Sequence, residues 1–404
     1  MSVSIWEGNK AQGVLDRLDK QNALLEVMAA SSLKSLASDW SGLAELANSG
    51  LFGEAYAIGD QFVDTWKDVA SNNQEYTYPY QLNHIGNVEL QDGEVLENRP
   101  FLQAHYAHPF GVQFSHQRAF LRCPSGLPIG TYYFTIESSW GSNVVAGDVV
   151  CFTTTQAIPA GGRISGCYGA PDQAKANWRI YTYSADGKTI IETITPTFSA
   201  SGTDLGTMKS SKRNGDLNSC QEMAYGWNRW MTSALRQYLN SALGVGLWWT
   251  AQDEWDIAPD QLTTKAGFLS GCSEDFINAI KPVKVVTYPN TVQDDTGGNT
   301  PDITYDKVFI PSLEQIYCNP QKSGEGEYHE YWKRKSGAQS PLATGQTYPQ
   351  MITYAVENHT SPQSVRLRSA GRGFAHYPWL VTSSGGVYFN YASNASRFSP
   401  LVVL

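Results

Sequence analysis

Charged side chains are scarce in this sequence. Asp, Glu, Lys and Arg make up 17% of the 404 residues, below the roughly one quarter that is usual in soluble proteins, and the formal net charge is -9. A chain with this charge lacks the positive surface that attracts nucleic acids and anionic membranes. It also lacks any run of about 18 apolar residues, so we expect no membrane insertion. The first residues lack the basic and apolar regions of a secretory signal peptide.

The cysteines and the common catalytic motifs exclude further classes. Six cysteines are spread singly and none forms a CxxC pair, which argues against a disulfide framework or a zinc ribbon. We expect them to be small buried residues of a chain made in a reducing cytosol. GxSxG, HExxH, Walker A and GxGxxG motifs are also absent. The sequence therefore predicts a non-enzymatic protein that needs no cofactor.

Three polar segments carry weaker alternatives. The histidines His105, His108 and His116 could bind a transition metal, but ordinary packing histidines are favoured over a metal site. The loop 294–299 could bind calcium with Asp302, although a solvated turn is favoured. Residues 325–330 hold three glutamates that could act as paired carboxylates, and we interpret them as a polar loop.

The hydrophobic pattern predicts an α+β chain in several parts. Residues 1–56 show helical spacing and are predicted to attach or oligomerise the protein; a helical cap on its own domain is the alternative. Short alternating segments with turn signals at 119–207 predict an inserted all-β sandwich. The flanking segments 57–118 and 208–404 would form one domain. Within it, helices are expected over 228–240 and 273–280, and the apolar end of the chain is expected to be a buried strand.

The C-terminal 47 residues have an unusual composition. From Asn358 to Leu404 there is no Asp, Glu or Lys, while four arginines alternate with aromatic, Ser, Asn and Gly residues. Rigid aromatic rings and small polar side chains are typical of protein recognition surfaces. Neighbouring residues such as Tyr388 and Tyr391 cannot all face one core, which favours a recognition surface over aromatic core packing.

Several segments resemble a known family. Residues 367–370, 381–387 and 399–404 look like the closing pattern of C-type-lectin-like domains from phage and gut-bacterial proteins, roughly "W-L-R-S-P … S-G-x-V … S-P-A-L-V-I". Upstream, residues 230–240 and 308–317 resemble a helix and a strand of the same family. The resemblance implies a C-type-lectin-like domain, with the β module as an insertion. The same superfold includes formylglycine-generating enzymes, but those need a cysteine pair late in the chain, and no cysteine follows Cys318.

The resemblance also implies a function and a site. Some members are rewritten near the 3′ end of the gene by diversity-generating retroelements, so the ligand-binding face can be variable. Arg368 matches the fixed framework of the family and is expected to position backbone, and Gly373 falls within the variable region. The predicted ligand-binding residues are Arg366, Phe374, His376, Tyr377, Trp379, Tyr388, Asn390, Tyr391, Ser393, Asn394, Ser396, Arg397 and Phe398.

These observations predict a protein of a phage particle, made in the host cytoplasm and located in the virion. It would be a homo-oligomer, contact other virion proteins through its N-terminal helices and bind a bacterial surface receptor, either protein or glycan. A structural head or tail decoration protein is the main alternative. A carbohydrate-active enzyme is a third, which would require a carboxylate pair in a cleft.

Overall fold

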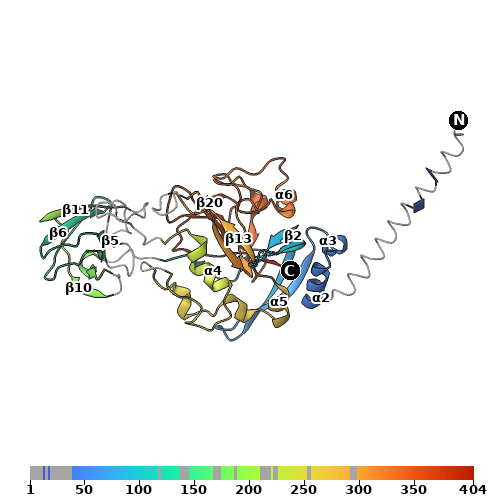
Figure 1. Ribbon diagram of the computed structural model, residues 1–404, viewed down its shortest axis with the longest axis horizontal. Coiled ribbons are helices and arrows are strands. Elements are labelled where there is room, and N and C mark those ends of the chain that lie inside the picture. Colours follow the sequence, from blue (N-terminus) through green and yellow to red (C-terminus); the bar gives the residue numbers. More distant parts are fainter. Residues whose placement is uncertain are drawn as a thin grey trace.

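The chain folds into short helices and several small sheets, as the α+β expectation required (Figure 1). This computed structural model describes residues 12–13, 17–18, 39–116, 120–136, 145–166, 174–185, 189–209, 220–221, 226–252, 256–291 and 298–404. Within these ranges, no helix has the length and apolar character that crossing a membrane requires.

The central sheet joins the two ends of the described chain. Its five antiparallel strands follow the order β1 (Gln61–Asp68), β2 (Gln74–Glu89), β3 (Val95–Ala104), β22 (Leu401–Val403) and β15 (Val308–Phe309). Val402 of β22 pairs with Leu102 of β3, and both side chains are fully buried. The expectation of a buried strand at the C-terminus is therefore confirmed. The sheet takes strands from both sides of the β module, so one domain is built from two separated stretches of sequence.

Local features of the sequence explain strand β1 and the turn between β2 and β3. Along β1 every second residue is buried, which is the alternation seen in the sequence. The chain turns between β2 and β3 at Asp92 and Gly93, where Gly93 has a φ of 88° that an L side chain rarely adopts. The pair Asp92-Gly93 in the sequence predicts a tight turn, and the structure confirms it.

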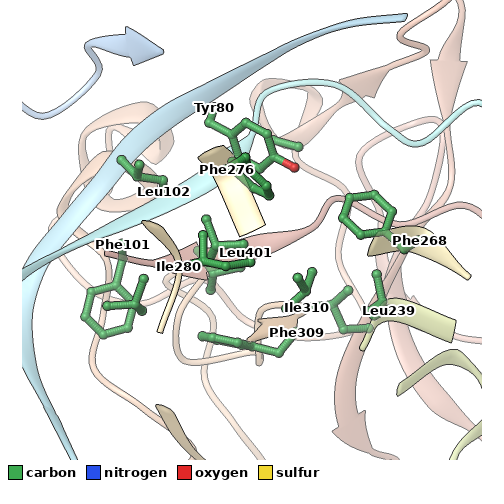
Figure 2. Close-up of a cluster of buried hydrophobic side chains, with 14 of the residues drawn as sticks. Tyr80, Phe101, Leu102, Leu239, Phe268, Phe276, Ile280, Phe309, Ile310 and Leu401 are labelled. Atoms are coloured by element: carbon green, nitrogen blue, oxygen red, sulfur yellow. The ribbon is translucent and has the colours of Figure 1, made fainter. Parts of the chain in front are cut away.

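Helices cover the central sheet and complete the main core (Figure 2). They are α2 (Trp40–Asn48), α3 (Phe52–Ala55), α4 (Ala234–Leu239), α5 (Glu274–Ala279) and α6 (Glu330–Ser336), with 3-10 turns η2 (Trp230–Thr232), η3 (Asp260–Thr263), η4 (Phe268–Gly271) and η5 (Pro349–Met351). A further 3-10 turn, η1 (Lys175–Asn177), belongs to the β module. The Trp40 ring of α2 packs edge-on against Phe276 of α5, with centroids 4.8 Å apart. Residues 40–55 therefore cap the domain. The attachment role predicted for residues 1–56 falls mainly on residues outside the described ranges.

Two predicted helices had different outcomes. The segment 273–280 forms α5, whose first turn is capped by the Ser273 hydroxyl accepting from the Phe276 amide at 3.2 Å. The single helix expected over 228–240 is wrong, because the chain makes η2 and then starts again as α4. Ser233 causes the break: it has extended backbone and its hydroxyl caps the Arg236 amide at 3.1 Å. The predicted apolar stripe is nevertheless buried in the core.

The β module lies at one end of the molecule, apart from the central sheet (Figure 1). Its eight strands follow the order β10 (Ile190–Ile194), β9 (Ile180–Tyr183), β8 (Gly162–Gly166), β5 (Phe120–Cys123), β12 (Cys220–Gln221), β11 (Thr203–Lys209), β6 (Thr131–Ile136) and β7 (Val149–Thr153). Strands β9 and β10 form the predicted antiparallel pair. The module has a hydrophobic cluster of its own, centred on Phe134, Phe152 and Ile164. Its last strand, β12, lies beyond the predicted end at 207.

Smaller sheets form the part of the domain that carries the candidate site. They pair β18 (Val365–Ala370), β19 (Pro378–Val381) and β20 (Val387–Phe389); β13 (Val283–Thr287) and β14 (Asp302–Asp306); β16 (Thr353–Tyr354) and β17 (Pro362–Gln363); and β21 (Ala395–Ser396) and β4 (Val112–Gln113). The four cysteines with described side chains, Cys123, Cys151, Cys272 and Cys318, are free thiols.

Candidate binding surface

Strand β18 is the frame of the C-terminal segment. All six of its residues are buried, including two arginines that point away from water. It pairs with β19, which in turn pairs with β20, and the rings of Phe374, Tyr377, Trp379 and Phe389 lie together at this small sheet. The segment 358–404 has no acidic side chain, and both arginines donate mainly to backbone carbonyls.

Arg366 anchors the chain that follows β20. One terminal nitrogen (Nη1) donates to the carbonyls of Pro378 and Asn390, at 3.2 and 3.1 Å. The other (Nη2) donates to the carbonyls of Tyr391 and Asn394 and to the Ser396 hydroxyl, at 2.9, 3.3 and 2.9 Å. Burial lowers the pKa of Arg366 to about 9, so the guanidinium stays charged at neutral pH. Arg366 was predicted to contact ligand, and the structure places it fully buried, where it holds the loop 390–396.

Arg368 holds a different loop in the same way. Its Nη1 atom donates to the Ile310 carbonyl at 2.8 Å, and its other terminal nitrogen donates to the Glu325 carbonyl. The side chain is buried. The expectation that Arg368 positions backbone is confirmed.

Four neighbouring aromatic rings form a continuous group that reaches solvent, which we call the aromatic surface: Phe374, Tyr377, Phe389 and Tyr391. Ring centroids lie 5.2 Å apart for Phe374 and Tyr377, 4.8 Å for Tyr377 and Phe389, and 5.0 Å for Tyr377 and Tyr391. Phe374 and Phe389 are 39% and 40% exposed, while the tyrosines are half-buried. Burial and the hydrogen bond with Tyr391 raise the pKa of Tyr377, so its hydroxyl is neutral.

Two buried rings support this surface from below. The Trp379 ring meets Phe389 edge-on at 5.3 Å and belongs to the cluster that also contains Leu367 and Val387. His376 lies against Tyr377 and Tyr391, at centroid distances of 4.1 and 5.5 Å. Both were predicted to contact ligand, and the structure places both in the interior, each 4% exposed. They fix the positions of the rings that are exposed.

The other predicted ligand-binding residues also differ in their exposure to solvent. Phe398 is fully buried in the main core, stacked on His108 with centroids 4.6 Å apart, because β22 begins three residues later. Arg397 forms an ion pair with Glu357 at 2.7 Å and is half-buried. Tyr388 is 42% exposed, but on β20 it pairs with Leu380, whereas Phe389 pairs with Trp379. It therefore projects from the other face of the strand. The remaining predicted residues are half-buried or exposed: Asn390, Ser393, Asn394 and Ser396.

Phe389 is the residue that sequence reasoning missed. The resemblance to the lectin-like family implied Tyr388, Asn390 and Tyr391 as ligand-binding residues and left out Phe389. Because β20 ends at Phe389, at the edge of the cluster under the sheet, both neighbours reach solvent. The exposure of Phe389 depends on where β20 ends, and the sequence does not show the end of this strand.

The weaker metal alternatives are not assembled. Both ring nitrogens of His108 are used by tyrosine hydroxyls, Tyr78 at 2.5 Å and Tyr238 at 3.1 Å. His105 lies against Gln81 at 2.8 Å. Among the described residues, no group of three His, Cys, Asp or Glu side chains could hold a metal ion. The loop 294–299 lies largely outside the described residues, and Asp302 is bound by Arg229 at 2.6 Å.

The C-terminal half of the chain is similar to one known family. Residues 205–400 match a domain of unknown function, DUF6273. This range starts in the last part of the β module and includes β18, β19, β20 and the whole aromatic surface. No curated protein and no solved structure is similar to the chain.

Proposed function

We propose that this protein is a non-enzymatic binding protein of a phage particle, with a C-type-lectin-like domain that contacts a bacterial surface receptor through the aromatic surface. The observation that carries the proposal is a group of four neighbouring aromatic rings on a rigid frame, with Phe374 and Phe389 exposed and the two tyrosines half-buried. Burying exposed aromatic rings against a partner is favourable, because it removes apolar surface from water. Aromatic residues also contribute much of the binding energy at protein interfaces.

The electrostatics support a receptor that is bound without charge pairing. The segment 358–404 has no carboxylate or lysine, and its arginines are directed to other parts of the chain. Arg366 and Arg368 bind backbone carbonyls, and Arg397 is paired with Glu357. The rings of the aromatic surface are therefore the main contact groups, with Asn390 and Asn394 beside them to form hydrogen bonds.

The contacts of Arg366 are compatible with sequence variation in the loop 390–396. Arg366 has four contacts to residues of the loop 390–396, and three of them are to main-chain carbonyls, so side chains in that loop can change without loss of those three bonds. This arrangement fits a target of a diversity-generating retroelement, in which exposed positions change and buried ones do not.

The test is binding of the purified, fluorescently labelled full-length chain to intact bacterial cells, measured by flow cytometry. We expect the double variant Phe374→Ala/Phe389→Ala to lose at least about tenfold in cell binding, because two central rings are removed. The matched control is Tyr354→Ala, whose side chain has the same 39% exposure as Phe374 but lies on β16, outside the aromatic surface. Equal binding of both variants would refute the proposal. Binding to assembled particles instead of cells would favour a decoration protein.

A further inference from the structure

An exposed loop without polar side chains follows α4. Residues 242–247 read Ala-Leu-Gly-Val-Gly-Leu, and all of them are exposed; we call this segment the apolar loop. Its three large side chains, Leu243, Val245 and Leu247, are 54%, 44% and 64% exposed. Single exposed aliphatic residues are common on protein surfaces, but three within five positions indicate an interaction site. The apolar loop shares no residue with the aromatic surface, so the inference does not rest on the proposed function.

Hydrogen bonds to a neighbouring segment fix the backbone of the apolar loop. The Gly246 amide donates to the Leu262 carbonyl at 2.8 Å, and the Leu243 carbonyl accepts from the Gly267 amide at 2.9 Å. Gly246 has a φ of 83°, which an L side chain rarely adopts, so glycine permits the turn at this position. The exposed side chains therefore stand on a defined backbone that is bonded to the segment 262–267 at two points.

Two tryptophans follow the apolar loop. The buried Trp248 ring meets Tyr238 of α4 edge-on at 5.3 Å, and its indole nitrogen donates to the Lys265 carbonyl at 2.7 Å. The next residue, Trp249, is half-buried. Trp248 thus anchors the loop in the main core, while Trp249 keeps part of its ring at the surface. A partly exposed tryptophan beside aliphatic side chains is typical of proteins at the boundary between water and lipid.

Charge is missing from the apolar loop and from its flanks. No Asp, Glu, Lys or Arg occurs between residues 237 and 252. In the segment 262–267 the only charged residue is Lys265, and its amine is paired with Asp68 at 2.6 Å. Asp260, just before this segment, is exposed. These two segments offer no free cation to an anionic partner, which favours a partner that is apolar and uncharged.

A lipid bilayer fits these features better than a protein partner. A stable protein interface uses roughly 20 to 30 residues on each side and surrounds its apolar centre with a polar rim. The apolar loop offers three large side chains and no polar one. A bilayer needs no complementary shape, only apolar side chains that reach its acyl chains without a charge to desolvate. Because a spanning helix needs about 20 residues, this contact is shallow, and the expectation of no membrane insertion holds for spanning segments only.

We propose that the apolar loop docks the protein on an uncharged phospholipid bilayer. Leu243, Val245 and Leu247 insert at the boundary between the headgroups and the acyl chains, and Trp249 lies among the headgroups. At this depth the peptide groups of the loop remain within reach of water, so none is stranded in hydrocarbon. Since no charged group takes part, binding does not depend on salt.

The test is flotation of the full-length chain with phosphatidylcholine vesicles. We expect equal binding at low salt and at about 1 M salt, where charges more than about 3 Å apart are screened. Vesicles that also contain phosphatidylglycerol should bind no more tightly. A wild-type chain that does not float with phosphatidylcholine would overturn the proposal. Binding that requires phosphatidylglycerol and is lost at high salt would overturn it as well.

Matched variants locate the contact. Leu243→Ala/Leu247→Ala should weaken vesicle binding at least about tenfold, because each inserted CH₂ group that is removed lowers partitioning several-fold. The control is Val63→Ala/Ile129→Ala, which truncates side chains that are 59% and 64% exposed elsewhere on the molecule and should bind as the wild type does. Val245→Leu adds one CH₂ group and should strengthen binding by up to about fourfold.

Melting temperatures separate loss of contact from loss of folding. All three variants should melt close to the wild type, because the replaced side chains are exposed. Equal vesicle binding of the two double variants, or no gain in Val245→Leu, would overturn the assignment of the loop. A wild-type chain that ignores vesicles but forms an oligomer that Leu243→Ala/Leu247→Ala dissociates, seen by sedimentation, would show a protein contact instead and overturn the proposal.

Discussion

Replacing Arg366 tests whether the buried contacts of β18 hold the loop 390–396, which carries Tyr391 of the aromatic surface. In Arg366→Met the side chain keeps much of its apolar stem, but all five hydrogen bonds to residues 378–396 are lost. A hydrogen bond to a charged group contributes about 1.5 to 3 kcal/mol to stability. Removing the arginine also removes the cost of burying its charge, which offsets part of the lost hydrogen-bond energy. We therefore expect a net loss of roughly 3 to 5 kcal/mol, the usual result of breaking a buried charged network.

Arg366→Lys is the graded comparison. An ammonium group has three donors and no planar fork, so it can reach at most three of the five acceptors. We expect about half of the methionine variant's loss. Both variants are expected to weaken cell binding although the side chain touches no receptor, because the loop that carries Tyr391 loses its support.

The assay combines chemical denaturation with hydrogen exchange of the segment 390–396. The expected result is fast exchange at these amides in Arg366→Met, intermediate exchange in Arg366→Lys and unchanged exchange in the central sheet. A stability loss below about 1 kcal/mol, with unchanged exchange in the loop, would refute the assignment of Arg366 to the frame.

Two further predictions concern stability. The Lys335 nitrogen lies 4.6 Å from the centre of the Trp332 ring. Burial of this side chain lowers the pKa of Lys335 from 10.5 to about 8. The unfolded chain then binds more protons than the folded chain between about pH 8 and 10.5, so stability should rise with pH in this window, by up to about 3 kcal/mol. Lys335→Met should be more stable than the wild type at pH 7 and lack this rise in denaturation experiments; equal slopes for both proteins would contradict the assignment. Phe398→Ala should lose about 3 to 5 kcal/mol in the same assay, because the ring is fully buried against His108 and Tyr238, and a loss typical of an exposed residue would show that Phe398 is not part of the core.

Local signals in the sequence were sufficient where one residue decides the structure. The alternation of β1, the turn at Gly93 and the short helix over 273–280 each depend on residues within a few positions, and the structure has all three. The expected helix over 228–240 failed for a local reason as well, since Ser233 prefers the cap position to the helix interior.

The division of the C-terminal segment could not be predicted in this way. Arg366, Trp379 and Phe398 have the same residue types as an exposed recognition surface, so composition groups them with Phe374 and Tyr377. What separates them is contact with distant parts of the chain. The acceptors of Arg366 lie 12 to 30 residues away, and Phe398 reaches a histidine at position 108. Strand ends and register decide these contacts, and a single sequence does not reveal them.

The most direct test of the division between frame and face is deep sequencing of the 3′ end of the gene in a population that carries it. We expect substitutions to concentrate at exposed and half-buried positions such as Phe374, Tyr377, Asn390 and Tyr391, and to be absent from Arg366, Trp379 and Phe398. Variation spread evenly over buried and exposed positions, or a C-terminal segment no more variable than the rest of the chain, would contradict a diversified binding face.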